Sequence, residues 1–121
     1  MFDYGTMAKM FVVLTKGKDD INMLNVASNF AYYSVKNAGA KVSFMFLGRG
    51  VENLLKDSNG VKPVIDSVNK MKDVDIDVSY CKVSVGGMGL KEEQLIEGLR
   101  PVMGGVETAK KIDDGYSVVT F

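Results

Sequence analysis

The sequence contains no histidine and a single cysteine, Cys81. The absence of histidine excludes Ser-His-Asp and Cys-His catalysis within one chain, and it removes imidazole as a metal ligand. A single cysteine excludes an internal disulfide and a CxxC metal or redox pair. Any chemistry must therefore depend on Cys81, carboxylates, lysines, tyrosines or backbone amides, and we expect neither a metal site nor a bound cofactor.

Long apolar runs and an excess of one charge are also lacking. The longest apolar runs, residues 10–14 and 44–47, are far shorter than the roughly 20 residues that span a bilayer. Basic and acidic residues number 15 each and are well mixed, so the net charge is zero. We therefore expect neither a membrane nor a nucleic acid as a direct partner, and self-association meets no long-range charge repulsion.

The length and composition are typical of one globular domain. The chain has 121 residues, of which 46% are apolar and 25% charged, and we expect a single domain over residues 1–121. Residues 1–7 show no periodic pattern, so we expect them to be disordered or to precede the true start, with Met7 as an alternative start. They also lack the pattern of a signal peptide, which predicts a cytoplasmic location.

Five segments have the pattern of β-strands. Residues 10–14 are a continuous apolar run with β-branched residues, as in a strand that is buried on both faces, and residues 42–47 (VSFMFL) are expected to form the second strand. Residues 74–80 alternate between apolar and polar side chains, which predicts a strand with one wetter face. Residues 99–103 and 116–121 complete the set, and Pro101 restricts the former to a position where a missing N–H is harmless.

The segments between these strands have helical spacing. A long helix is expected from Asp19 or Asp20, either of which can cap it, to Gly39. Further helices are expected at residues 51–55, 61–71, 91–97 and 104–113. Strands that alternate with helices predict an α/β protein with three layers (α/β/α), a five-stranded, mainly parallel sheet and a flavodoxin-like architecture.

Ligand sites in such sheets lie beyond the carboxyl ends of the strands, which directs attention to Cys81. The thiol follows the third strand directly, so we expect it at the mouth of a site. Gly86, Gly87 and Gly89 can present backbone N–H groups to a thiolate, with Lys82, Ser84 and Lys91 as further stabilising residues. The alternative is an inert buried cysteine that behaves as a small apolar side chain.

Three other loops also follow predicted strands, residues 15–20, 48–50 and 103–105, and functional residues are expected there too. Thr15, Lys16 and Gly17 are candidates for phosphate binding, although the acidic residues after them favour ordinary helix capping. Arg49 and Gly50 are candidates for anion binding at a helix start, and a tight strand-to-helix turn is the competing interpretation. We treat the first two loops as secondary candidates.

An ordered set of motifs along nearly the whole chain resembles the DsrE/DsrF-like (TusD-related) sulfur-relay family. Cys81 and the residues after it carry the sharpest part of the likeness. The segments concerned are Thr15-Lys16-Gly17, Gly39-Ala40-Lys41-Val42, Gly48-Arg49-Gly50-Val51, Cys81-Lys82-Val83-Ser84, residues 88–98 (MGLKEEQLIEG), Gly104-Gly105-Val106, Asp114-Gly115-Tyr116 and residues 118–121.

The resemblance implies a compact α/β/α subunit that assembles into homotrimers or hexamers, and a cysteine at the position of Cys81 that holds sulfur as a persulfide. The implied function is that of an intracellular sulfur carrier or sulfurtransferase subunit with a sulfur-donor and a sulfur-acceptor protein as partners. Lys91 departs from the Thr or Ser that often caps the helix after the cysteine. A different class of function stays open: a non-catalytic oligomeric subunit that binds a small anion or nucleotide, with a structural cysteine.

Overall fold

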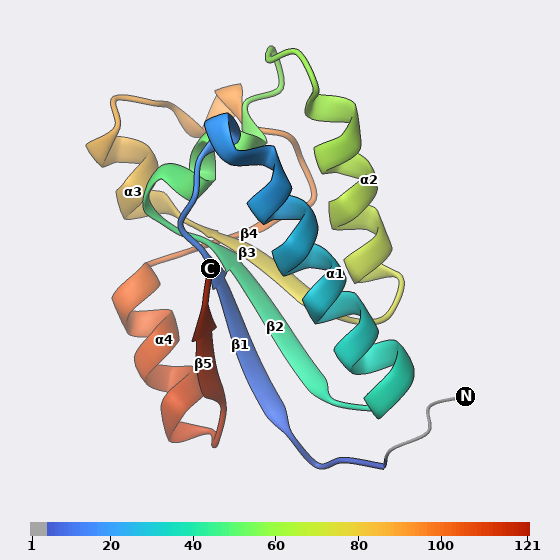
Figure 1. Cartoon of the computed structure of the whole chain (residues 1–121). Coiled ribbons are helices and arrows are strands. Elements are labelled where there is room, and N and C mark those ends of the chain that lie inside the picture. Colours follow the sequence, from blue (N-terminus) through green and yellow to red (C-terminus); the bar gives the residue numbers. More distant parts are fainter. Residues whose placement is uncertain (1–4) are drawn as a thin grey trace.

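The computed structural model describes residues 5–121, which form one five-stranded sheet with the strand order β4-β3-β2-β1-β5 (Figure 1). All four pairs of neighbouring strands are parallel. The strands are β1 (Lys9–Leu14), β2 (Lys41–Phe46), β3 (Asp77–Cys81), β4 (Arg100–Val102) and β5 (Ser117–Thr120). The α-helices are α1 (Ile21–Ala38), α2 (Val61–Lys72), α3 (Lys82–Gly87) and α4 (Gly104–Asp113), with 3-10 turns η1 (Lys18–Asp20), η2 (Gly48–Leu54) and η3 (Glu92–Gln94).

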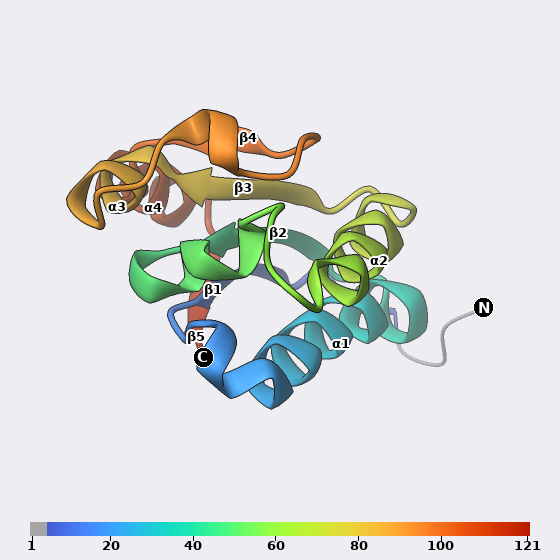
Figure 2. The ribbon, with the colours of Figure 1, turned by 90° about the horizontal axis from the view of Figure 1, so that it is seen from above.

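The helices lie on both sides of the sheet, as Figure 2 shows from above. Helices α1 and α2 pack side by side against β1, β2 and β3 on one face, whereas α4 lies on the opposite side of the sheet. The short helix α3 lies at the carboxyl ends of the strands, beside η2 and β4. The expected α/β class and the five-stranded sheet are therefore confirmed, and the sheet is parallel throughout.

The central strands are buried on both faces because their side chains alternate between two apolar clusters. Val12 and Phe44 point into the larger cluster, beneath α1 and α2. Phe11 and Met45, one position away on the same strands, belong to a smaller cluster on the other face. This period of two explains why residues 10–14 of β1 and 44–46 of β2 appear in the sequence as apolar runs without alternation.

The predicted ends of α1 are confirmed. The Asp20 carboxylate accepts a hydrogen bond from the Met23 backbone N–H at 3.3 Å, which satisfies one of the free donors of the first turn. Gly39 ends the helix in the left-handed conformation, with φ 73°, and its N–H is bonded to the Val35 carbonyl. A side chain at that φ would be strained, so glycine suits this position.

The two weakest strand patterns occupy the edges of the sheet. β4 pairs only with β3, and β5 pairs only with β1. Pro101 therefore lies on an edge strand, where its missing N–H removes no essential bond from the ladder, as the sequence required.

The prediction of a helix at residues 91–97 was wrong. That segment contains only the single 3-10 turn η3, and the α-helix begins earlier, at Lys82, immediately after the cysteine. The segment after η3 instead forms an isolated antiparallel bridge, Leu55 with Leu95, in which the Ile96 N–H donates to the Leu54 carbonyl at 2.8 Å. This long-range pairing overrides the helical spacing of the local sequence.

Other boundaries shift by a few residues. β3 begins at Asp77 instead of residue 74 and includes Cys81, and the short helix expected at residues 51–55 is the 3-10 turn η2. Residues 1–4 lie outside the described part of the chain. Gly5 to Ala8, which include the end of the segment expected to be disordered, carry no helix or strand.

An ion network joins β3, β4 and α4. The guanidinium of Arg100 bonds both carboxylate oxygens of Asp77, at 3.2 and 2.6 Å, and also the carboxylate of Glu107. Glu107 is only 8% exposed, so its charge depends on this partner for compensation.

Replacing Arg100 with alanine should lower the free energy of unfolding by about 2 kcal/mol, because the buried Glu107 carboxylate would lose its counter-charge. Urea unfolding at neutral pH measures the change. The matched control is Lys62→Ala, which breaks an exposed pair with Asp66 and should cost at most about 0.5 kcal/mol. Equal effects of the two variants would contradict this role for Arg100.

Candidate functional site

Cys81 is the last residue of β3, and its side chain belongs to the apolar cluster on the α4 face of the sheet. It packs there with Met45 and Val102 from the neighbouring strands. The expected place at the end of a strand is confirmed, but the residue is only 3% exposed, so the thiol is covered and does not lie open at the mouth of a cleft.

The same residue caps the helix that follows. Cys81 has an extended backbone, with φ −80° and ψ 110°, and α3 begins at the next residue. The Ser84 backbone N–H donates to the cysteine Sγ at 3.4 Å. The sulfur thus occupies the position that a Ser or Asp oxygen takes at many helix starts, and it lies close to free N–H donors.

Ser84 also connects the thiol to the loop after β2. Its Oγ accepts a hydrogen bond from the Gly48 backbone N–H at 2.9 Å. Since this bond uses a lone pair of Oγ, the Ser84 hydroxyl proton remains available as a donor to the sulfur. The hydroxyl is thereby held between η2 and Cys81.

The start of α4 is the third element around the sulfur. Gly104 is buried, and a Cβ at this position would lie 3.1 Å from the Cys81 Sγ and 2.9 Å from Cδ1 of Leu47. Glycine therefore allows the backbone of α4 to approach the thiol closely. The first turn of a ten-residue helix presents its positive end to the sulfur from this side.

Two opposing effects act on the pKa of Cys81. Burial is the largest and raises the pKa, because it penalises the charged thiolate. Hydrogen bonds from the Ser84 hydroxyl and from the backbone N–H groups of Ser84, Gly104 and Val83 lower it, and together they outweigh burial. The pKa of Cys81 is therefore lower than that of an ordinary thiol, which increases the thiolate fraction near neutral pH.

The other residues proposed around the thiolate are placed differently. Gly86 and Gly87 form the last two residues of α3, and Gly89 follows it with φ 72°, so this glycine-rich segment lies at the end of the helix opposite to the sulfur. The Met88 N–H is bonded to the Ser84 carbonyl and the Gly89 N–H to the Gly86 carbonyl. The Gly89 N–H is therefore not free to bond the sulfur. The backbone N–H groups that lower the pKa of Cys81 belong to Val83, Ser84 and Gly104.

Lys82 and Lys91 are both exposed. Lys82 starts α3 and lines a shallow cavity with Met103 and Lys110 along the outer side of β4 and α4. Lys91 lies before η3, where its backbone N–H donates to Oε1 of Gln94 at 2.8 Å. Lys82 thus lies next to Cys81 in the chain, whereas Lys91 belongs to a different loop.

The two secondary loops, at residues 15–17 and 49–50, are engaged in hydrogen bonds and ion pairs within the protein. The Thr15 hydroxyl and N–H both donate to the Phe121 carbonyl, at 2.9 and 2.8 Å, and the Lys16 carbonyl accepts a bond from the amide of Asn53. Arg49 pairs with Asp19 at 3.4 Å and with Glu52 at 3.3 Å.

Two glycines allow these loops to pack closely. At Gly17 an added Cβ would collide with the Glu52 carboxylate, and at Gly50 with the Leu14 carbonyl oxygen.

Sequence reasoning placed the loops at residues 48–50 and 103–105 at this edge of the sheet, but it missed Gly48 and Gly104 as contacts of the cysteine site. Ser84 was named, and its spacing of three from Cys81 carries a local signal, because a cap residue bonds the N–H three positions later. Gly104 lies 23 positions further along the chain and approaches only because α4 folds onto the same face as Cys81. No local pattern could have predicted that contact.

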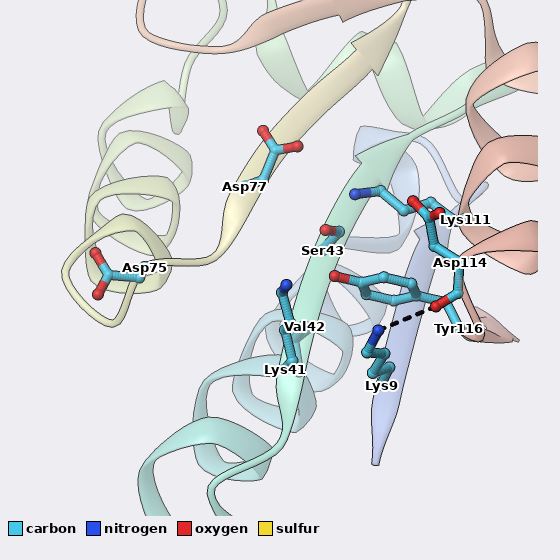
Figure 3. Close-up of a pocket in the computed structure, with 9 residues that line it drawn as sticks. All are labelled: Lys9, Lys41, Val42, Ser43, Asp75, Asp77, Lys111, Asp114 and Tyr116. Atoms are coloured by element: carbon cyan, nitrogen blue, oxygen red, sulfur yellow. Dashed lines mark hydrogen bonds between the residues drawn. The ribbon is translucent and has the colours of Figure 1, made fainter. Parts of the chain in front are cut away.

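A larger cavity, of about 400 Å³, lies away from Cys81, at the amino ends of the strands (Figure 3). In it the ammonium groups of Lys9 and Lys111 lie 5.5 and 4.8 Å from the centre of the Tyr116 ring. Its charges balance, with three lysines and three aspartates in the wall: Lys9, Lys41, Lys111, Asp75, Asp77 and Asp114. It has neither the thiol nor a helix N-terminus, so we do not assign the chemistry to it.

A model of the DsrE/DsrF-like family matches residues 8–121. The chain belongs to the DsrE/DsrF-like family. No curated protein matches it at a significant level. Within residues 5–121 no helix is long and apolar enough to cross a membrane, and no cluster of three potential metal ligands occurs.

Solved structures with the same fold have low sequence identity to this DsrE/DsrF-like chain. The ychN protein from E. coli is 15% identical with a TM-score of 0.75, over 95% of this chain and 100% of that chain. MTH1491 from Methanobacterium thermoautotrophicum, of unknown function, is 15% identical with a TM-score of 0.71, over 96% and 100%. BT1422 from Bacteroides thetaiotaomicron, also of unknown function, is 15% identical with a TM-score of 0.71, over 93% and 94%.

Replacing Ser84 with alanine should raise the pKa of Cys81, because the thiolate would lose the hydroxyl donor while remaining buried. The ultraviolet absorbance of the thiolate, measured against pH and corrected with a Cys81→Ser variant, reports this pKa directly. Ser58→Ala is the matched control, since the Ser58 hydroxyl donates to the Leu55 carbonyl far from the sulfur. An unchanged titration in Ser84→Ala would contradict the assigned role of the hydroxyl.

Proposed function

We propose that this DsrE/DsrF-like chain is a sulfur carrier or sulfurtransferase subunit that holds sulfur as a persulfide on Cys81. The observation that carries the proposal is the position of a buried thiol between two helix starts, where the Ser84 N–H donates to Sγ at 3.4 Å and Gly104 brings the first turn of α4 against the sulfur. These donors lower the pKa of Cys81 although burial raises it. A thiol that only fills space in an apolar core needs no such donors, and its pKa would be raised by burial.

The transfer step uses only thiol chemistry. The Cys81 thiolate attacks the outer sulfur of a persulfide on the donor protein, a new S–S bond forms on Cys81, and the donor S–S bond breaks. The donor leaves as a thiolate, so atoms and electrons balance without an external oxidant. Passing the sulfur on repeats the step in reverse, with a thiolate of the acceptor as the nucleophile.

The donors around Cys81 suit both forms of the group. A persulfide carries its negative charge on the outer sulfur, one bond further from the protein backbone than the thiolate. The first turns of α3 and α4 lie close to Sγ through Ser84 and Gly104, so they stabilise the thiolate, and we expect them also to stabilise the persulfide charge one bond away. Burial also protects the sulfur from over-oxidation.

Access requires a local movement, because Cys81 is 3% exposed. The side chain of Leu47 and the start of α4 lie against the sulfur. We propose that this cover opens transiently in the free protein and admits small reagents, and that the donor protein docks over the exposed apolar residues beside it, of which Val83 is 58% and Met103 50% exposed. The further parts of the proposal are a cytoplasmic location, assembly into homotrimers or hexamers, and a separate acceptor protein.

The second candidate is a non-catalytic oligomeric subunit that binds a small anion or nucleotide and has a structural cysteine. The burial of Cys81 among Met45, Val102 and Tyr116 favours it. Alkylation kinetics separate the two candidates. A carrier thiol reacts with iodoacetamide in the folded protein and at unusually low pH, whereas a structural thiol reacts only after denaturation.

Incubation with a small persulfide donor should add the mass of one sulfur atom to the wild-type protein and none to Cys81→Ser. Intact-protein mass spectrometry measures the gain, and a reducing thiol should reverse it. Circular dichroism of Cys81→Ser establishes that the variant folds. Sulfur loading that persists in the folded variant, or no loading of the wild type, would refute the carrier function.

A further inference from the structure

The outer edge of β5 is an open strand edge (Figure 1). Within residues 5–121, β5 pairs with β1 on one side and with no strand on the other. Ser117, Val118 and Thr120 are all exposed. The backbone of this edge is therefore accessible to another strand.

The hydrogen bonds of Phe121 show which backbone groups face outward. Its N–H donates to the Val13 carbonyl and its carbonyl accepts from the Thr15 N–H, both at 2.8 Å, so both groups point to β1. Backbone groups alternate in direction along a strand, so those of Thr120 and Val118 point away from β1. Two N–H groups and two carbonyls are thus left for an additional strand.

The opposite edge of the sheet is protected against such pairing, whereas the edge at β5 is not. In β4, Pro101 lacks an N–H and Arg100 carries a charge. Proline and charged side chains are common features that prevent an edge strand from pairing with another chain. Residues 116–121 (YSVVTF) contain neither, so β5 can accept a strand.

Apolar side chains lie on both faces of this edge. Val118 is 39% exposed and lies on the α4 face, as does Phe11, its partner in the ladder. Phe121 lies on the opposite face and packs against Phe30 with 5.2 Å between the ring centres, and Phe30 is 40% exposed. A strand added here would cover apolar surface on both faces in addition to forming backbone bonds.

The same strand of a second copy fits this edge. When two β5 strands run antiparallel with Val119 opposite its counterpart, Val118 of each copy lies opposite Thr120 of the other. All the outward N–H and carbonyl groups are then paired. Such a contact is self-complementary, as a two-fold interface requires.

The charges around β5 also favour a second copy. The strand itself is uncharged, so its pairing brings no like charges opposite each other. Asp113 and Asp114 precede its start, and Lys16 lies beside its end, next to the residue that bonds Phe121. These three side chains are exposed and form no ion pair within residues 5–121. An antiparallel arrangement brings the acidic end of one copy to the basic end of the other.

We propose that two copies of this chain join through β5 across a two-fold axis, so that two five-stranded sheets become one continuous sheet. The axis passes beside Val119, and backbone hydrogen bonds link Val118 of each copy with Thr120 of the other. The contact doubles whatever assembly the remaining surface forms, so that a homotrimer would become a hexamer. It is independent of the function proposed for Cys81.

Sedimentation equilibrium of the wild type and of Val118→Lys tests the proposal. The lysine places a charge beside the axis in each copy and removes no bond to β1, so the variant should have half the wild-type mass at about 0.2 mM protein. The matched control is Ile65→Lys, the same kind of change at a residue of α2 that is 37% exposed, and it should keep the wild-type mass. Circular dichroism establishes that both variants fold.

Hydrogen exchange tests whether this strand edge is the interface. The amides of Val118 and Thr120 should exchange slowly in the wild type, and that of Thr120 at least about tenfold faster in Val118→Lys. The Phe121 amide, which is bonded to Val13, should stay protected in both proteins. A second variant, Thr120→Pro, removes an outward N–H and no bond to β1, so it should also halve the mass.

Three results would overturn the proposal. The first is a wild type with the same mass as Val118→Lys. The second is fast exchange of the Val118 and Thr120 amides in the wild type at the protein concentration used for sedimentation, which would leave this edge to a strand of a different protein. The third is an equal loss of mass in Ile65→Lys, because the effect would then not depend on β5.

Discussion

The parallel pairing of β1, β2 and β3 is the constraint on which the site depends. Because all strands run the same way, their carboxyl ends meet at one edge, and the loops after β2 and β3 become neighbours there. The alternation of side chains along β3 then decides that Tyr80 faces α1 and α2 whereas Cys81 faces α4. A shift of one residue in this register would place the thiol in the other apolar cluster, away from Gly104.

The thiol combines burial with hydrogen-bond donors, two features that act in opposite directions on its charge. Burial alone would make Cys81 an inert core residue, and donors alone would leave an exposed thiolate open to oxidation. Here the helix that starts at Lys82, the helix that starts at Gly104 and the hydroxyl of Ser84 supply donors inside an apolar cluster. Charge is thus stabilised where water has little access.

The two faces of the sheet share the same loops. The segment from Leu47 to Leu54 contributes the Gly48 N–H to Ser84 on one side and the buried side chain of Asn53 on the other, beside the starts of α1 and α2. Asn53 also ties this segment to the Lys16 carbonyl in the loop after β1. The loop after β2 is therefore bonded both to the cysteine site and to the loop after β1.

The sequence by itself determined the α/β class, all five strands to within about three residues, the ends of α1 and the position of Cys81 at a strand end, because apolar periodicity and caps are local signals. It did not determine the start of α3 at Lys82. The glycine-rich residues 86–89 therefore lie at the end of this helix and not beside the sulfur. It also did not determine the 3-10 turn at residues 92–94, which long-range pairing imposes. Only the tertiary structure decided that Gly104 and Gly48 reach the cysteine site, and that Oδ1 of Asn53 lacks a donor. Contacts between residues far apart in the chain arise from packing across the sheet, and no local pattern encodes them.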